Sequence, residues 1–428
     1  MNEIKEVYNE YLREKLYFAT HKSGLKIIFV PKKFTTSFAI LGVRYGSTDS
    51  SFMCGDEKEF AVVPDGIAHY LEHKMFENED GSDAFEAFSK LGANANAFTT
   101  HNLTAYLFSC TSNFEKSLEA LIDFVRKPYF TKENIDKERG IIGEEIEMYE
   151  DDPYSCLHYG MLDLLYENNP VKINVAGTVE SVSKITAEHL YRCYDAFYTL
   201  DNMVLSVSGD TDMDSIMAVC DRLLCESEPK LVKRPEVHEP ESVREKRKSI
   251  ERPVSKPLFC IGIKDSVISD DRERVKRSIA AEILVDMLFG PSSSFYSKLY
   301  TDGTVNSMSC GYESMINYAF SYIIGESELC EKVYEHFRYT VDNAVEHGLN
   351  RSDFDRIKKV TVANFVKGFD STENIATDAL YMELDGVSID EYASLIFEVD
   401  FDYVSGMTEE FLSEERCAMM TVDVKRKG

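Results

Sequence analysis

Residues 65–77 read D-G-I-A-H-Y-L-E-H-K-M-F-E, and the spacing of their side chains predicts a helix. His69 and His73 lie four residues apart, so in a helix their imidazoles share one face, with Glu72 between them. Apolar side chains recur every four residues on the opposite side, at Ile67, Leu71 and Met75. Two imidazoles one turn apart can bind a single zinc ion, and a carboxylate beside them can accept a proton from water there.

This H-x-x-E-H pattern is the inverse of the more common metalloprotease motif H-E-x-x-H. The alternative is an amphipathic helix whose solvated face carries His69, Glu72 and His73 without any metal ion. A chain of 428 residues with nine histidines produces such a pattern by chance only rarely, which favours the metal site. A zinc site also needs a third protein ligand from elsewhere in the chain.

The length and composition are those of a globular protein with more than one domain. At 428 residues a single hydrophobic core is not expected, and the apolar fraction of 44% fits a folded chain. No apolar stretch is long enough to span a membrane, and the charged N-terminus lacks the apolar core of a signal peptide. The ten cysteines form no C-x-x-C pair, which indicates free thiols in a reducing compartment and predicts a cytoplasmic location.

Acidic residues outnumber basic ones by 75 to 47, which gives a net charge of −28 at pH 7. This charge repels both the phosphate backbone and anionic lipid surfaces, so we expect neither nucleic acid nor membrane as a partner. It permits a preference for basic peptides, although an acidic surface also serves solubility alone.

Hydrophobic periodicity predicts a series of strands and helices in both halves of the chain. The expected helices, besides the one at the motif with Asp65 as its N-cap, lie at 2–14, 82–91, 114–125, 132–150, 154–166, 186–198 and 280–289. The expected strands and extended segments lie at 25–30, 38–45, 92–100, 103–110, 203–207, 258–263 and 417–424. Residues 48–63 are expected to form a loop.

Residues 226–257 have the composition of a linker, because they hold five of the eleven prolines and many charges of both signs. We therefore expect an N-terminal domain at 1–225 that carries the metal site, and a C-terminal domain at 258–428.

The second half repeats the first in outline. Aligning Phe289 with Phe76 puts, in place of His69, Glu72 and His73, the residues Glu282, Val285 and Asp286. Residues 349–356 likewise echo 130–137. We therefore predict an α+β fold of two related domains, each an antiparallel sheet with helices packed on one face, of which only the first keeps the metal ligands. The alternative is two unrelated α+β domains.

The best candidate for the third ligand lies in residues 137–149. As a helix this segment turns inward a face formed by Glu138, Ile141, Ile142, Glu145, Met148 and Tyr149. A carboxylate among apolar neighbours needs a cation or a hydrogen-bond donor. A zinc ion would supply this for Glu145, and the N–H of a ligating imidazole would supply it for Glu138. The alternative is that these glutamates all belong to a solvated face.

Three motifs together resemble the pitrilysin/insulysin family of inverzincin metallopeptidases, which includes mitochondrial processing peptidase. The motifs are His69-x-x-Glu72-His73, then Glu138-Arg139 followed by Glu145, and finally Asn96-Ala97-Phe98-Thr99. The paired halves match as well, so the resemblance spans nearly the whole chain, and the length is similar to that of small bacterial members. The combination is specific, whereas any one motif alone would not be.

The resemblance implies that His69, His73 and Glu145 bind Zn²⁺, that Glu72 is the general base for peptide-bond hydrolysis, and that Glu138 supports a ligand from behind. It also implies that the two domains face each other as halves of a clamshell. The enclosed chamber would admit peptides or short unfolded segments.

The same resemblance places Asn96, Ala97 and Phe98 on an edge strand that binds the substrate. An extended peptide can add a strand to a sheet edge through main-chain hydrogen bonds, which requires no particular sequence. Small side chains such as Ala97 let two backbones approach closely. The alternative is an ordinary edge strand or loop.

The chain departs from the family in its second half, where many members carry an Arg and, seven residues later, a Tyr that contact the substrate. Aligned through residues 297–299, those positions hold Tyr300 and Ser307. We therefore expect a homologous peptidase-like partner, in a heterodimer or a homodimer, to supply the missing groups. Two alternatives stay open: a non-catalytic peptide-binding or structural subunit, and a metal-dependent hydrolase that acts on something other than peptides.

Overall fold

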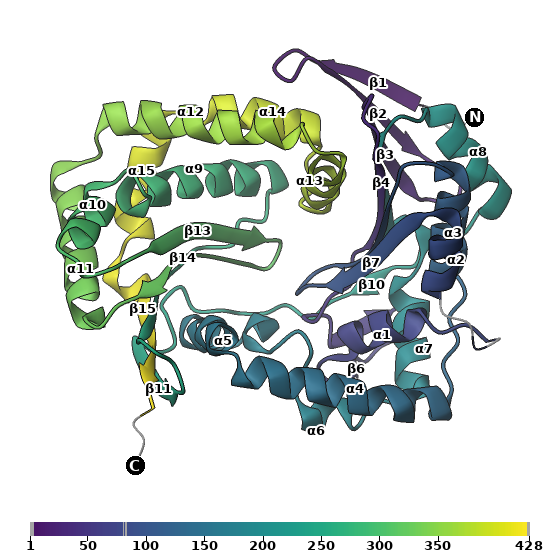
Figure 1. Cartoon of the computed structure of the whole chain (residues 1–428), viewed down its shortest axis with the longest axis horizontal. Coiled ribbons are helices and arrows are strands. Elements are labelled where there is room, and N and C mark those ends of the chain that lie inside the picture. The colour runs from purple at the N-terminus through teal and green to yellow at the C-terminus, as the bar shows by residue number, and fades with distance from the viewer. Residues whose placement is uncertain (1–3, 80, 82–83, 426–428) are drawn as a thin grey trace. The chain divides into compact units, whose positions relative to one another are not determined.

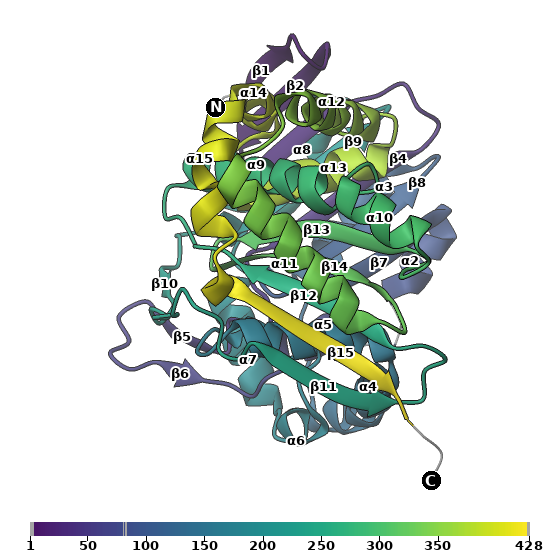
Figure 2. The same ribbon diagram turned by 90° about the vertical axis from the view of Figure 1, so that its left-hand side faces the viewer.

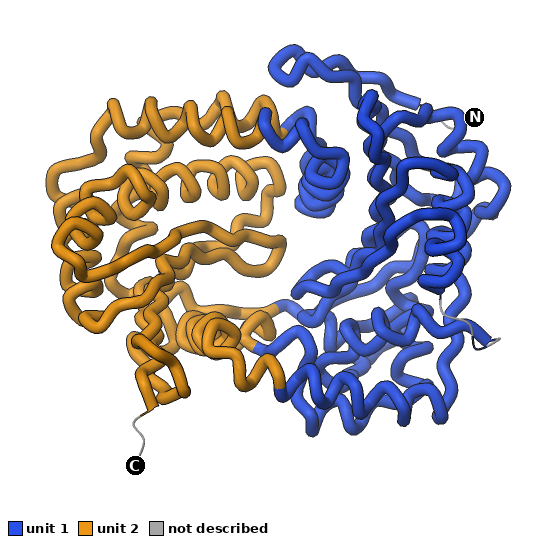
Figure 3. The backbone as a smooth tube through the Cα atoms, viewed as in Figure 1, with its two compact units in different colours: residues 1–147, 173–236, 366–391 blue, residues 148–172, 237–365, 392–428 orange. Residues whose placement is uncertain are grey.

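The chain folds as an α+β protein, which confirms the predicted class. The structure, a computed structural model, describes residues 4–79, 81 and 84–425. It contains sheets of seven, three and five strands. Two compact units divide the chain: unit 1 comprises 1–147, 173–236 and 366–391, and unit 2 comprises 148–172, 237–365 and 392–428 (Figure 3).

The large sheet of unit 1 consists, in spatial order, of β1 (Ile4–Asn9), β2 (Glu14–Thr20), β3 (Lys26–Pro31), β9 (Met203–Gly209), β4 (Ser37–Val43), β8 (Thr104–Cys110) and β7 (Ala93–Thr99). Neighbouring strands are antiparallel except β3 and β9, which are parallel. The central strands β4 and β9 are buried along their whole length. A small second sheet joins β10 (Val232–Lys233), β5 (Ser51–Cys54) and β6 (Ala61–Val62).

The helices of unit 1 are α1 (Ile67–Met75), α2 (Ala84–Leu91), α3 (Phe114–Val125), most of α4 (Lys132–Asp151), α6 (Val179–Val182), α7 (Ala187–Phe197), α8 (Met213–Leu223) and α13 (Thr372–Leu384). Helices α2 and α3 pack on β7 and β8, and α8 packs on α3. Helix α13, from far along the chain, packs on β9, β4 and β3 from the other side of the sheet (Figure 1).

The sheet of unit 2 consists, in spatial order, of β11 (Arg247–Arg252), β15 (Cys417–Val424), β12 (Leu258–Lys264), β14 (Tyr318–Glu326) and β13 (Met308–Met315), as Figure 2 shows. Its helices are α5 (Pro153–Leu165), α9 (Asp271–Phe289), α10 (Ser294–Thr301), α11 (Cys330–His347), most of α12 (Arg351–Gly368), most of α14 (Ile389–Glu398) and α15 (Phe401–Phe411). None of the helices in the described ranges combines the length and the low polarity that crossing a bilayer requires.

The two units share one strand topology, which confirms that they are related. The order β3-β9-β4-β8-β7 in unit 1 corresponds to β11-β15-β12-β14-β13 in unit 2, and the first pair of each series is parallel. The parallel pair in each sheet differs from the predicted antiparallel arrangement. It arises because β9 returns after several helices and inserts between β3 and β4, as β15 does between β11 and β12. The similarity between residues 349–356 and 130–137 aligns Arg351 with Lys132. Helix α12 begins at Arg351 and α4 begins at Lys132, so the two helices start at equivalent positions.

Each unit also takes one helix from the other half of the chain. Helix α5 packs on β12 and β15, where its apolar side chains share a core with Leu258, Cys260 and Met420. Helix α13, from the second half of the chain, packs on β9 and β4 of unit 1. The compact units therefore do not follow a single cut in the predicted linker at 226–257.

A glycine in each central strand makes room for the exchanged helix. A Cβ atom on Gly42 of β4 would lie 2.7 Å from Leu380 Cδ1 of α13, and one on Gly262 of β12 would meet Met161 Sδ of α5. Both separations are shorter than a van der Waals contact, so these positions allow close approach of helix and sheet.

We expect Gly42→Val to lower the stability of unit 1 by about 1–3 kcal/mol, because the added methyl groups overpack the contact with α13. Thermal unfolding followed by circular dichroism measures the effect. The control is Gly406→Ala in α15, where an added Cβ meets nothing within 4 Å. Equal melting temperatures for Gly42→Val and the native protein would contradict the account of the α13 contact.

Several sequence-based expectations in unit 1 are wrong. A helix is expected at 2–14, of which residues 2 and 3 lie outside the described part of the chain; residues 4–14 instead form β1, a turn and the start of β2, a hairpin in which Ile4 pairs with Ala19. The dense charges there hid the period-two alternation of a strand. The N-cap of the motif helix is Gly66, not Asp65 as expected. Gly66 adopts a left-handed backbone conformation with φ 87°, and no side chain caps the helix there.

The expected loop at 48–63 contains the short strands β5 and β6. The linker likewise contains β10 and β11. In unit 2, α9 starts at Asp271, well before the expected position 280, because the Asp270 carboxylate accepts a hydrogen bond from the Glu273 N–H and caps the helix.

Candidate metal centre

Helix α1 is fixed in place on almost all sides. A Cβ on Gly66 would collide with the Ala176 carbonyl oxygen, so the entry to the helix requires glycine. The expected apolar stripe at Ile67, Leu71 and Met75 is buried. In addition, the Tyr70 hydroxyl donates a 2.6 Å hydrogen bond to the Ile135 carbonyl of α4. This contact docks α1 against the helix that carries the predicted third ligand.

The structure brings His69, His73 and Glu145 together: one ligand atom from each lies within 4.8 Å of the others. The Glu145 carboxylate oxygens lie 3.7 Å from His69 Nε2 and 3.5 Å from His73 Nε2. These separations exceed those of ordinary N–H···O hydrogen bonds. Ligands about 2.0–2.1 Å from a tetrahedral zinc ion would lie about 3.3–3.4 Å apart, and the two separations between Glu145 and the imidazoles are close to this value.

The Nδ1 atoms of the two imidazoles, on the side of each ring away from Glu145, have different surroundings. His73 Nδ1 lies 3.1 Å from Glu138 Oε1, which directs Nε2 toward Glu145. Among the residues that the structure describes, the buried Nδ1 of His69 has no hydrogen-bond partner. The structure therefore places the Glu138 carboxylate beside an imidazole nitrogen of the motif, while its support of a metal ligand stays a prediction.

Glu72 lies on the same helix and is buried, with 8% of its surface exposed. The Thr99 hydroxyl, at the end of β7, donates a 2.6 Å hydrogen bond to Glu72 Oε2. Sequence reasoning assigned no separate role to Thr99, although it is the fourth residue of the motif Asn96-Ala97-Phe98-Thr99. The contact fixes one carboxylate oxygen and leaves the other without this restraint.

Burial and neighbouring charges set the protonation of these groups. Burial, together with the proximity of His73, lowers the pKa of His69 to about 4, so its imidazole stays neutral as a metal ligand must be. Burial also raises the pKa of Glu72, against the opposing effect of the Thr99 hydrogen bond. A carboxylate with a raised pKa is a stronger proton acceptor than an exposed one.

The Glu138 carboxylate has the opposite character. The hydrogen bond with His73, followed by the charge of Lys74, lowers its pKa despite partial burial. For His73, burial acts to lower the pKa, but the Glu138 hydrogen bond and the surrounding carboxylates raise it overall. The pair is therefore an ionised acceptor facing an imidazole donor.

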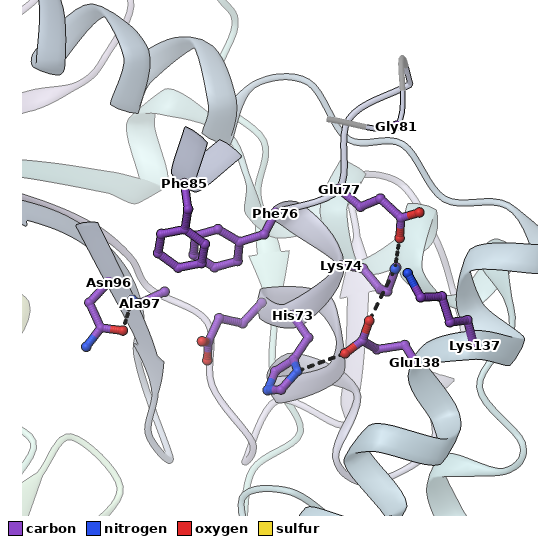
Figure 4. Close-up of a pocket in the computed structure, with 11 residues that line it drawn as sticks. His73, Lys74, Phe76, Glu77, Gly81, Phe85, Asn96, Ala97, Lys137 and Glu138 are labelled. Atoms are coloured by element: carbon purple, nitrogen blue, oxygen red, sulfur yellow. Dashed lines mark hydrogen bonds and ion pairs between the residues drawn. The ribbon is translucent and has the colours of Figure 1, made fainter. Parts of the chain in front are cut away.

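A pocket of about 420 Å³ opens beside His73, with Glu72, Asn96 and Ala97 in its wall (Figure 4). Strand β7, the terminal strand of the large sheet, contributes Asn96 and Ala97. The Ala97 N–H donates to the Asn96 side-chain oxygen at 2.9 Å. Phe98, also predicted to bind substrate, is not part of this pocket lining.

Stacked aromatic rings form another part of the pocket. The rings of Phe76 and Phe85 lie 4.3 Å apart with an angle of 3° between their planes. Both residues line the pocket, so one wall is apolar while the wall at Glu72 and Glu138 is acidic.

The predicted inward face of α4 is only partly correct. Glu138 and Glu145 do point toward the site, but Ile141 and Met148 are 51% and 58% exposed. The buried stripe of the helix is formed by Asn134, Ile135, Ile142 and Ile146. The helix is thus rotated relative to the expectation, and the two glutamates lie at the margin of its apolar stripe.

In unit 2 the residues aligned with the motif lie on α9, where Val285 is buried between Glu282 and Asp286. Within the described residues, His69, His73 and Glu145 form the only group of three or more potential ligands that meets these distances. Tyr300, on α10, is 58% exposed, and Ser307 is also exposed.

The structure thus combines two related units with a group of potential metal ligands, His69, His73 and Glu145, in one of them. Comparison with known proteins agrees. The family model described as insulinase (peptidase family M16) matches residues 63–179, and the model described as peptidase M16 inactive domain matches residues 184–361. The chain belongs to peptidase family M16, which confirms the resemblance to the pitrilysin/insulysin metallopeptidases.

Relatives of similar length cover nearly the whole chain. An uncharacterised zinc protease of Bacillus subtilis (strain 168), YmfH, is 36% identical over 426 residues, which cover 98% of this chain and 99% of the relative. A crystal structure of an M16-like peptidase from Alicyclobacillus acidocaldarius is 29% identical, with a TM-score of 0.91 and 99% coverage of both chains. A protease from Helicobacter pylori, 17% identical with a TM-score of 0.80 over 99% of this chain and 100% of that one, shares the fold.

Proposed function

We propose that this protein is a zinc-dependent endopeptidase that hydrolyses peptides or short unfolded segments. The observation that carries the proposal is the convergence of His69 Nε2, His73 Nε2 and the Glu145 carboxylate beside the buried Glu72. When bound there, zinc supplies Lewis-acid chemistry that polarises a carbonyl group and makes water nucleophilic near neutral pH. The names of the zinc-protease relatives support the same metal.

The residues around the site have separate roles in this proposal. The Glu72 carboxylate takes a proton from the water that attacks the scissile carbonyl carbon, and passes it to the amide nitrogen as the C–N bond breaks. Thr99 restrains the carboxylate during both transfers through its hydrogen bond to Oε2. Glu138 accepts the Nδ1–H of His73 and thereby leaves Nε2 available as a ligand.

The terminal strand β7 supplies the binding surface for the substrate backbone. Asn96 and Ala97 lie beside the pocket that contains Glu72 and His73. An extended peptide that pairs with β7 would take over the Ala97 N–H, which now donates to its neighbour's side chain. Backbone pairing favours unstructured peptides of varied sequence as substrates. The enclosing chamber and the cytoplasmic location that the sequence predicts stay predictions.

We also infer that a homologous peptidase-like subunit completes the active enzyme. The support is that Tyr300 and Ser307 occupy the positions at which many relatives carry Arg and Tyr. Both positions are exposed, and neither can donate the bidentate hydrogen bonds of a guanidinium. Full activity in a gel-filtration peak of the monomeric chain would refute the need for a partner.

The proposed activity is tested with the purified full chain, alone and with the protein that co-purifies with it. We expect about one zinc per chain by elemental analysis, and cleavage of an unstructured quenched-fluorescence peptide that a chelator abolishes and added zinc restores. Bound zinc with no cleavage in either preparation would instead favour the rival function, a non-catalytic peptide-binding or structural subunit, to which Tyr300 and Ser307 also point.

A further inference from the structure

Lys74, the residue that follows the H-x-x-E-H motif, is buried to an unusual degree for a lysine. Only 1% of its surface is exposed. An ammonium group removed from water is costly unless carboxylates surround it. Lys74 Nζ meets this requirement with two partners, Glu77 one turn further on and Glu138 of α4, whose Oε2 lies 3.4 Å away.

One of these partners is also the support of a proposed zinc ligand. Glu138 Oε2 faces Lys74 Nζ, while Glu138 Oε1 lies 3.1 Å from His73 Nδ1 (Figure 4). Two consecutive residues of α1 therefore hold the two oxygens of a single carboxylate. A carboxylate held at both oxygens cannot rotate away from the imidazole without breaking one of these contacts.

The orientation of Glu138 has a direct consequence for His73. An ionised carboxylate only accepts hydrogen bonds, so the nitrogen that faces it must carry the proton. With the proton on Nδ1, the lone pair is on Nε2, the nitrogen directed toward Glu145. If Glu138 turned toward solvent, His73 would lose the contact that selects this tautomer.

We propose that Lys74 is a positioning residue of the metal centre: it holds Glu138 in the orientation that fixes the His73 tautomer and leaves Nε2 free for zinc. This inference rests on the proposed zinc site and adds to it a residue that lies outside the ligand set. The Glu77 carboxylate forms a second ion pair with the buried Lys74 ammonium group.

The test measures zinc affinity by competition with a chromophoric chelator, for the full chain and its variants. We expect Lys74→Met to weaken zinc binding about 10–100-fold, the range seen when the support of a ligating histidine is lost. Lys74→Arg, which keeps the charge, should restore most of the affinity. The matched control is Lys90→Met, which breaks an exposed pair with Glu86 on α2 and should bind zinc as the native chain does.

A double-mutant cycle shows whether Lys74 acts through Glu138. If it does, Lys74→Met should cause little further loss of affinity in a Glu138→Gln background. A merely structural lysine would weaken binding equally in both backgrounds, and that result would overturn the proposal. If Lys74→Met alone fails to fold, Lys74→Met with Glu77→Gln removes the unpaired charge, and thermal unfolding of the metal-free protein verifies its fold.

The remaining outcomes separate this inference from the zinc site itself. Native affinity in a folded Lys74→Met or Lys74→Met/Glu77→Gln variant would overturn the role of Lys74 and leave the zinc site standing. Failure of the native chain to bind zinc at all would overturn both.

Discussion

Glu72→Gln is expected to leave zinc binding intact and to reduce peptide cleavage by about 10²–10⁴-fold, the usual contribution of a general acid–base group. The glutamine amide has nearly the shape of the carboxylate, and its oxygen can still accept the hydrogen bond from the Thr99 hydroxyl. It cannot accept the proton from water, however. Turnover of a quenched-fluorescence peptide should therefore fall, while the zinc content measured by elemental analysis should stay unchanged.

A matched control for this substitution is Glu144→Gln, which makes the same chemical change on the exposed side of α4. We expect that variant to keep both zinc and activity. If Glu72→Gln cleaves peptides at the native rate, Glu72 is not the base. If it loses zinc as well, its role lies in the structure of the site and not in proton transfer.

His69→Ala and Glu145→Ala are expected to weaken zinc binding by more than about 100-fold, because the loss of a direct ligand should exceed the loss of an outer partner. Each variant removes one of the three proposed ligands, whose ligand atoms lie within 4.8 Å of one another. The measurement is again competition with a chelator, made on the full chain so that the fold of unit 1 is complete.

Two controls make this result specific to the site. Glu147→Ala removes an exposed glutamate two residues from Glu145 on the same helix, and His347→Ala removes an exposed histidine at the end of α11. Both should retain native affinity. Unchanged zinc content in His69→Ala or Glu145→Ala would refute the ligand set and, with it, the proposed hydrolysis.

The parts of the site that the sequence predicted depend on local periodicity. His69 and His73 share a helix face whatever the rest of the fold does, and Glu145 was found from the phase of a second helix. Even there the phase was approximate, since Ile141 and Met148 are exposed instead of buried. A carboxylate at the margin of an apolar stripe can still reach the site because its side chain is long.

The contacts that the sequence did not predict depend on elements that meet only in the folded chain. Thr99 reaches Glu72 because β7 ends beside α1, and Lys74 reaches Glu138 because α1 docks on α4. A lysine beside a motif is usually solvated, so its spacing gave no sign of burial. Strand order and the parallel pair β3/β9 likewise follow from long-range returns of the chain, which periodicity does not encode.

The reciprocal placement of α5 and α13 also bears on how such a protein can evolve or be taken apart. A protease cut between the halves, in residues 226–236, would leave two fragments that each still contain the helix covering the other's sheet. Such a nicked protein should therefore stay assembled under native conditions. For the same reason, a single crossover at the linker with a distant relative would pair each sheet with a helix from a different parent, which we expect to disturb both cores.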